Sequence, residues 1–327
     1  MFASEQAQRG VVLTLVSNLA TSYVALRALD RQLEIARATT ANFEKTAHIF
    51  DLRYKQGVVS KVEVMQITSQ VQQAKAAIPL FEQAIAAQEN LISLLLGRNP
   101  GPIPRGKTID QLLAPAIPAD LPSTLLERRP DVLQAEQNLV AANASVGAAR
   151  ALYYPNISLT GLLGTVSTTF SDLFTGPSQA WRAGGSIAGP IFTFGAVRGQ
   201  NASADAVREQ ALLGYQQTIL NAFRETNDAL TGSTLKANEL AEQQARVAAL
   251  RDFARLSNLR FENGMTSYID VLVAENELFA AELASVRISA ERQAQVINVY
   301  RAMGGGWVTT ATNQANNAPA KASASGG

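Results

Sequence analysis

The sequence contains no cysteine, almost no histidine and little charge. Its 327 residues include no Cys and one His, and charged residues make up 17% of the chain, whereas soluble domains average about 25%. Without thiols, a disulfide framework and a thiolate metal site are both excluded. The net charge of +1, with Lys and Arg scattered singly, argues against nucleic acid as a partner.

The common catalytic motifs are absent as well. There is no pair of histidines in a zinc-protease arrangement, no phosphate-binding loop and no nucleophile elbow. The single histidine, His48, lies in an expected helix, where a packing or surface role accounts for it. Gly161, Gly164 and Gly189 lie inside or at the edge of expected strands, which does not match a dinucleotide fingerprint. The sequence therefore predicts no enzyme, no cofactor and no metal site.

Neither a membrane-spanning helix nor a signal peptide is predicted from the sequence. No apolar run reaches the roughly 18–20 residues of a membrane-spanning helix. Residues 1–9 lack the basic start, apolar run and small-residue cleavage site of a signal peptide. Taken alone, these two absences favour a cytoplasmic protein, although a hydrophobic share of 47% is enough for a large core.

One stretch of the sequence occurs twice. Arg53–Val64 and Arg260–Val271 share the order Arg, aromatic, two polar residues, Gly, two residues, Ser, two residues, acid, Val. The offset between the copies is 207 residues, and it continues without a gap to Gly97 and Gly304. The repetition indicates an internal duplication with the same turn in each half.

Residues 4–97 are expected to form two long antiparallel helices joined at the first copy. Pro is absent from 4–54, and apolar residues recur there at spacings of three and four, which predicts a helix of about 75 Å. Gly57 should end this helix in a left-handed conformation, and Ser60 with Glu63 should form a capping box for the next. The expected apolar face of the first helix is Val12, Leu15, Leu19, Tyr23, Leu26 and Leu29.

The second helix of this pair has apolar residues at heptad spacing, as in a coiled coil. Pro79 lies inside it and should kink or break it. The expected face is Ile67, Val71, Ala74, Ile78, Phe81, Ile85, Ile92 and Leu95, with Gln88 filling one position.

Residues 195–304 repeat this arrangement. A helix from about Gly199 to Asn263 should end at Gly264, and Ser267 should cap the helix that follows. The expected face of that last helix is Phe279, Leu283, Val286, Ala290, Ile297 and Tyr300.

The remaining segments differ in character. Residues 98–129 are proline-rich and predict an extended connector with a short helix at 109–113. Helix should resume at 130–154, with Pro130 in its first turn. Residues 305–327 have the composition of a disordered tail.

Residues 155–194 predict a β-hairpin. Two runs rich in Ile, Leu, Thr, Ser and Gly flank a polar turn, and the second run alternates, with an apolar face formed by Trp181, Ala183 and Ile187. Runs of this length suit a membrane-barrel strand pair. The aromatic residues beside them, such as Tyr153, fit a core or a membrane-interface belt equally well.

Several motifs together resemble the outer-membrane efflux protein family (TolC-like), in particular its OprM/NodT-type lipoprotein branch. They are Arg-Arg-Pro-Asp-Val at 128–132, the segment Ala148–Ile157, Gly-Pro-Ile-Phe at 189–192, and the two repeated tips. The resemblance covers about residues 6–307.

This resemblance implies a mainly α fold in which long antiparallel coiled-coil helices form a trimeric α-barrel tunnel in the periplasm. The β-hairpin then contributes to a twelve-stranded outer-membrane β-barrel, to which each protomer gives four strands. Such proteins are passive exit ducts of tripartite efflux pumps or of type I secretion systems. The implied partners are a periplasmic adaptor protein, an inner-membrane pump and outer-membrane lipid.

The resemblance also implies roles for residues at the tips. Arg53, Gly57, Arg260 and Gly264 match the positions that dock the adaptor, and Asp270 matches an acid that lines the periplasmic gate and attracts cations. Without the resemblance, the arginines need only meet the negative ends of their helices, and Asp270 need only cap a helix.

The sequence departs from the family at two points. Val273 stands where some members carry a second gate acid. A signal peptide, a lipid-bearing Cys and a first hairpin are not found, which predicts a fragment lacking the first third of such a protein. The alternative class is a coiled-coil envelope scaffold with no pore.

Overall fold

The computed structural model describes residues 2–112, 128–174 and 176–305. The chain divides into two compact units, residues 1–3 with 132–219 and residues 4–131 with 220–327. The predicted tail and most of the second half of the proline-rich connector lie outside the described residues. The long elements are α1 (Phe2–Lys55), α2 (Lys61–Leu95), α4 (Pro130–Ala151), α5 (Ala196–Glu262) and α6 (Tyr268–Ala302), with strands β1 (Asn156–Thr165) and β2 (Gln179–Ala188).

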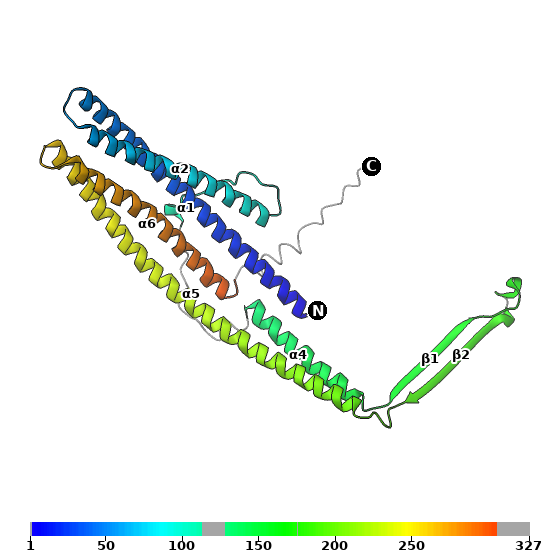
Figure 1. Ribbon diagram of the computed structural model, residues 1–327. Helices are drawn as coiled ribbons and strands as arrows, with labels where there is room; N and C mark the ends of the chain where they lie inside the picture. Colours follow the sequence, from blue (N-terminus) through cyan, green and yellow to red (C-terminus); the bar gives the residue numbers. More distant parts are fainter. Residues whose placement is uncertain (1, 113–127, 175, 306–327) are drawn as a thin grey trace. The chain divides into compact units, whose positions relative to one another are not determined.

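Two helical hairpins, α1–α2 and α5–α6, make up most of the second unit (Figure 1). Their last helices are each 35 residues long, and their bounds are related by the 207-residue offset of the sequence repeat. The ends also match: Gly97 and Gly304 have φ of +66° and +81°. The duplication in the sequence is therefore a duplication of helical hairpins.

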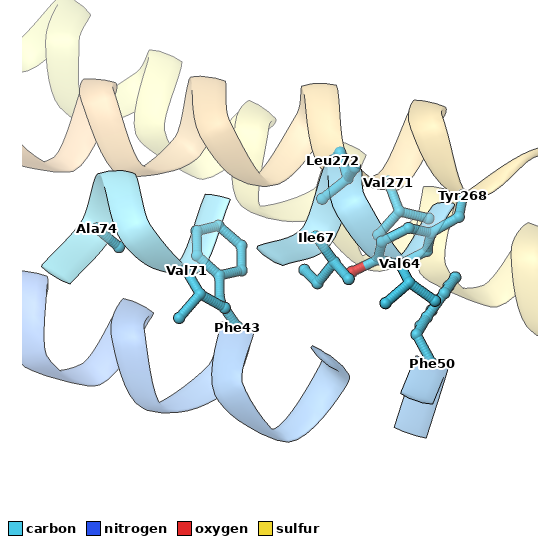
Figure 2. Close-up of a cluster of buried hydrophobic side chains, with 9 residues drawn as sticks. All are labelled: Phe43, Phe50, Val64, Ile67, Val71, Ala74, Tyr268, Val271 and Leu272. Carbon is cyan, nitrogen blue, oxygen red and sulfur yellow. The ribbon is translucent and has the colours of Figure 1, made fainter. Parts of the chain in front are cut away.

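A shared core joins the two hairpins near their turns. It contains side chains from α1, α2 and α6, and Phe261 of α5 packs against it (Figure 2). Phe50, Ile67 and Val271 are at most 1% exposed there. This cluster contains Phe43, Phe50, Val64, Ile67, Val71, Ala74, Tyr268, Val271 and Leu272.

The expected face of α2 is largely correct, whereas that of α1 is wrong in part. Ile67 and Ile92 of α2 are buried, and Gln88 donates a hydrogen bond to the Ser22 carbonyl of α1 at 2.9 Å. Leu15 of α1, however, is 41% exposed. The reason is that α1 packs on two neighbours, since Leu26 contacts the Ile92 cluster of α2 while other α1 residues meet α6.

Pro79 does not break α2, which is continuous from Lys61 to Leu95. Of the two predicted outcomes, a break is wrong, and a kink stays a prediction. One lost backbone hydrogen bond is tolerated because the flanking turns of a 35-residue helix are held by packing against α1.

One helix among the described residues, α1, contains an 18-residue window that is long and apolar enough to cross a membrane. The prediction that no such stretch exists is wrong by this criterion. Length and composition are weak support for a span, because a packed core helix passes the same test. Leu26 and Ala36 of α1 are fully buried within its own unit.

The first part of the connector lies against the α1–α2 hairpin. The Tyr23 hydroxyl accepts a hydrogen bond from Gly106 N at 2.8 Å, and Arg27 donates to the Lys107 carbonyl at 3.0 Å. The expected short helix is a single turn of 3-10 helix, η1 (Ile109–Gln111).

The β-hairpin belongs to the first unit and is shorter than predicted. Ten residues of β1 pair antiparallel with ten of β2, from Asn156 opposite Ala188 to Thr165 opposite Gln179. The ladder stops before Gly189. A Cβ added at Gly189 would lie 2.9 Å from Pro155. The next residue, Pro190, has no N–H to donate to the ladder. Proline chemistry therefore ends the ladder at 188 rather than 194.

Candidate functional site

The two tips of the helical hairpins lie at the same end of the second unit (Figure 1). Each turn is closed by the same two backbone hydrogen bonds, all 2.9 Å long. In the first tip the Val58 N–H bonds the Arg53 carbonyl, and in the second the Met265 N–H bonds the Arg260 carbonyl. The repeated arginines thus occupy equivalent positions in the last turns of α1 and α5.

Gly57 and Gly264 make these turns possible. Their φ angles are +75° and +70°, in the left-handed region that disfavours other L-residues. A Cβ at either position would meet nothing within 4 Å. The glycines are therefore required by the backbone conformation of the turn and not by crowding.

The two copies differ in how the next helix begins. In the first, Ser60 and Glu63 form a reciprocal capping box, with the Ser60 N–H donating to the Glu63 carboxylate at 2.7 Å. In the second, the Ser267 side chain makes no capping bond, and the Asp270 carboxylate accepts a hydrogen bond from the Thr266 hydroxyl. Asp270 is exposed and does not close a capping box, which separates it from Glu63.

Three aromatic rings connect the two hairpins just behind the tips. Tyr268 of α6 contacts both Phe50 of α1 and Phe261 of α5, with ring centroids 4.3 and 5.1 Å away, and these two rings stack on each other at 6.0 Å. Figure 2 shows Tyr268 and Phe50 side by side. The Arg53 guanidinium lies over the Phe261 ring, 5.8 Å from its centroid, so Arg53 contacts the opposite hairpin.

Arg260, the counterpart of Arg53, is exposed. Among the parts of the chain that the structure describes, its side chain forms no hydrogen bond, ion pair or ring contact. Sequence reasoning treated the two arginines alike, but the structure gives them different surroundings. Only Arg53 is held against an aromatic ring.

Two polar groups lie in the seam between α1 and α6, behind the tips. Burial, aided by the negative charge of Glu275, raises the pKa of Tyr268 well above its usual range. Burial also raises the pKa of Glu275, whose Oε2 atom has no hydrogen-bond partner among the described residues. Neither residue was expected from the sequence. Tyr268 and Glu275 are seven residues apart, so the heptad pattern of α6 places both on one face of the helix.

A groove of about 480 Å³ opens beside Glu275, between α1, α5 and α6. Its other charged side chains are paired, Arg31 with Glu34 at 3.0 Å, Glu282 with Arg251 at 2.6 Å, and Arg255 with Asp252 at 3.4 Å. The described residues contain no group of three or more His, Asp or Glu side chains placed to hold a metal ion. The geometry at this end is that of a helical junction with exposed turns, with no catalytic constellation in the described part.

Comparison with known proteins identifies the family. The family model for outer membrane efflux proteins matches residues 1–98 and 121–305. The cation efflux system protein CusC of Escherichia coli O6:H1 is 34% identical over 93% of this chain and 66% of its own length. The toluene efflux pump outer membrane protein TtgF of Pseudomonas putida is 33% identical, over 93% of this chain and 64% of its length.

A solved structure agrees. The open state of the Neisseria gonorrhoeae MtrE outer membrane channel superimposes with a TM-score of 0.84 at 27% identity, covering 93% of this chain and 69% of that one. The chain spans about two thirds of the length of these relatives. The family match, together with the helical hairpins and the strand pair, shows that the chain belongs to the outer membrane efflux protein family.

Proposed function

We propose that the complete protein is the outer-membrane exit duct of a tripartite efflux system. It resides in the outer membrane and the periplasm and conducts passively, without catalysis. The proposal is supported by membership of the outer membrane efflux protein family and by relatives that are named as efflux components, among them the outer membrane protein TtgF. Those relatives are named for cations and for toluene, so their names do not assign a cargo to this chain.

The β-hairpin is the observation that carries the proposal. Each strand has ten residues, about 33 Å along the strand, and a tilt near 45° reduces this to about 23 Å, close to the apolar band of outer-membrane barrels. Leu159, Leu163 and Trp181 are 88%, 86% and 78% exposed on one face of the hairpin. Such a face is stable against lipid and unfavourable in water.

A homotrimer completes the barrel. A strand pair has two open edges and cannot span a membrane by itself, because every backbone group there needs a partner. We propose that each complete protomer contributes four strands to a twelve-stranded barrel, of which β1 and β2 are two. The paired helical hairpins of three protomers then enclose the periplasmic tunnel.

The tips are the proposed periplasmic mouth. Arg53, Gly57, Arg260 and Gly264 form the proposed docking surface for an adaptor protein that connects to an inner-membrane pump. The support is the repetition of the same exposed turn, and Arg260 offers an exposed cation without a partner among the described residues. A glutamate at Arg260 should impair export and adaptor binding but not trimer formation; unchanged export would remove Arg260 from the docking surface.

Asp270 is the proposed gate residue. Its carboxylate is exposed one turn beyond the second tip, and it is not used in a capping box. Three such carboxylates around a narrow opening would concentrate cations. Val273, at the position of a second acid in some relatives, adds no further charge.

The decisive experiment is to reconstitute the complete protein in planar lipid bilayers. A duct gives discrete conductance steps and sediments with the outer membrane, whereas a coiled-coil scaffold gives neither. The variant Asp270→Ala should keep its conductance steps and lose part of its cation preference. An unchanged preference would take Asp270 out of the gate without affecting the duct.

A further inference from the structure

The β-hairpin has two chemically different faces, which the strand register defines. Side chains on one strand share a face with the residues paired directly opposite them. The apolar face contains Ile157, Leu159, Leu163, Trp181, Ala183 and Ile187. The polar face contains Ser158, Thr160, Arg182 and Ser186, together with Leu162, Gly184 and small residues.

Hydrogen bonds hold the polar face together. The hydroxyls of Ser158 and Ser186 lie 2.9 Å apart across the ladder, and the Thr160 hydroxyl donates to the Gly184 carbonyl at 3.2 Å. These groups occupy alternate pairs of the ladder, which are neighbours on the same face. The face is thus a polar surface from the helix end of the hairpin to its middle.

Arg182 is the only charged residue in either strand. It is exposed and pairs in register with Leu162, so no acid lies opposite it. Within the described residues its guanidinium has no hydrogen bond or ion pair. A permanently charged group is therefore held on the polar face with no opposite charge in either strand to neutralise it.

The cost of placing arginine in lipid decides which face meets water. An Arg on the lipid side of a barrel costs about 2–4 kcal/mol near the midplane, whereas the lumen side accepts charge. The exposed Ile, Leu and Trp side chains of the other face suit lipid. If the hairpin is part of a barrel, both preferences are met only when the Arg182 face lines the lumen.

We propose that Arg182 lines the lumen of the barrel, where its copies in a trimer form a cationic ring that favours anions and disfavours cations. This inference rests on the proposed function as a channel. The ring would be a selectivity element of the exit barrel, and its charge is opposite in sign to that of Asp270.

Arg182 lies close to the middle of its strand, on the side of the outer mouth. It lies three residues from Gln179 at the closed end of the ladder and six from Ala188 at the end that adjoins α5, or about 10 and 20 Å along the strand. The helices connect to the open end, so the closed end is the far one. The ring is therefore nearer the outer mouth.

The width of the barrel determines how the ion selectivity of the ring depends on salt concentration. Twelve strands spaced about 4.8 Å apart and tilted by about 40° give a backbone radius of about 12 Å. The Debye length is about 30 Å at 0.01 M salt and about 3 Å at 1 M. The field of the ring should thus fill the lumen in dilute salt and be confined to the wall in concentrated salt.

The test measures the reversal potential of the complete protein in planar bilayers across a KCl gradient. Arg182→Gln should shift it toward cation selectivity when both solutions are near 0.01 M and leave it unchanged near 1 M. Arg182→Glu should shift the reversal potential further in the same direction. Arg182→Lys, which keeps the positive charge, should give the reversal potential of the unchanged protein. Conducting channels whose reversal potential is the same in all four proteins would overturn the inference while leaving the channel itself intact.

A pair of neighbouring substitutions tests the face assignment independently. Thr160→Arg, on the polar face, should insert into the outer membrane and increase anion preference in dilute salt. Leu159→Arg, on the apolar face, should reduce the amount of inserted trimer. Equal insertion of both variants, or loss of only the Thr160 variant, would overturn the assignment, and a complete protein that never conducts would instead refute the proposed function.

Discussion

Arg129 is expected to fasten the start of α4 to the α5–α6 hairpin, at the end opposite the tips. It is 7% exposed, and its guanidinium reaches three elements of the second unit. It donates to the carboxylates of Asp131 and Glu225 at 2.6 and 2.8 Å and to the Ala302 carbonyl at 3.1 Å. Burial opposes its charge, but the hydrogen bonds to the two carboxylates outweigh burial and raise the pKa of Arg129.

The size of the effect follows from the exposure of the partners. Removing one member of a fully buried ion pair costs about 3–5 kcal/mol. Asp131 and Glu225 are 49% and 44% exposed, so water can solvate them after the arginine is gone. The Ala302 carbonyl at the end of α6 loses a charged donor as well. We therefore expect Arg129→Met to lower the free energy of unfolding by about 2–3 kcal/mol.

The neighbouring Arg128 is the matched control, because its side chain is exposed and has no partner among the described residues. Arg128→Met should change the free energy of unfolding by less than about 0.5 kcal/mol. Urea unfolding of the purified protein in detergent, followed by circular dichroism at 222 nm, measures both variants. If the Arg129 variant unfolds at the same urea concentration as the Arg128 variant, the three contacts do not stabilise this end of the hairpins.

Three further predictions concern the helices. Burial raises the pKa of Glu275 above its ordinary 4.5, so its stabilising contribution is complete below 4.5 and is lost as pH rises through the folded value. Glu275→Gln should therefore raise the melting temperature at pH 8 but not near pH 4; an equal effect at both would contradict this. In urea unfolding, Gly304→Ala should lower the free energy of unfolding by at least about 1 kcal/mol more than Gly57→Ala. A Cβ at Gly304 would lie 2.8 Å from the backbone oxygen of Arg128, whereas a Cβ at Gly57 would meet nothing within 4 Å. Ser60→Ala should cost about 1 kcal/mol and Ser267→Ala measurably less, since only Ser60 makes a capping bond; equal losses would refute the difference between the tips.

Local chemistry explains why much of the fold could be predicted. Gly57 and Gly264 end helices because the left-handed conformation is accessible to glycine at little cost, which requires no distant partner. The apolar face of β2 follows from alternation along the strand. The trimeric tunnel came from the resemblance to the family, because periodicity cannot reveal it, and it stays a proposal for this chain.

The incorrect predictions for the face of α1 and for the length of the strand ladder have different physical origins. Leu15 follows the periodicity of α1 but is exposed, because α1 packs against both α2 and α6 and its buried stripe is set by those neighbours. The ladder ends at Ala188 because Pro155 and Pro190, which lie just beyond the last pair, have no N–H to donate. Periodicity describes one element at a time, so it includes neither the packing partners of α1 nor the missing N–H groups of these prolines.

The sequence by itself determined the duplicated hairpins, their turns and the two-faced strand pair, because each depends on residues within a few positions of one another. Only the tertiary structure decided that Arg53 lies on Phe261, that Tyr268 packs on Phe50 of the other hairpin and that Asp270 bonds Thr266 instead of closing a capping box. The first two depend on bringing residues more than 200 positions apart into contact, and the third on a competition between nearby donors that spacing alone cannot resolve.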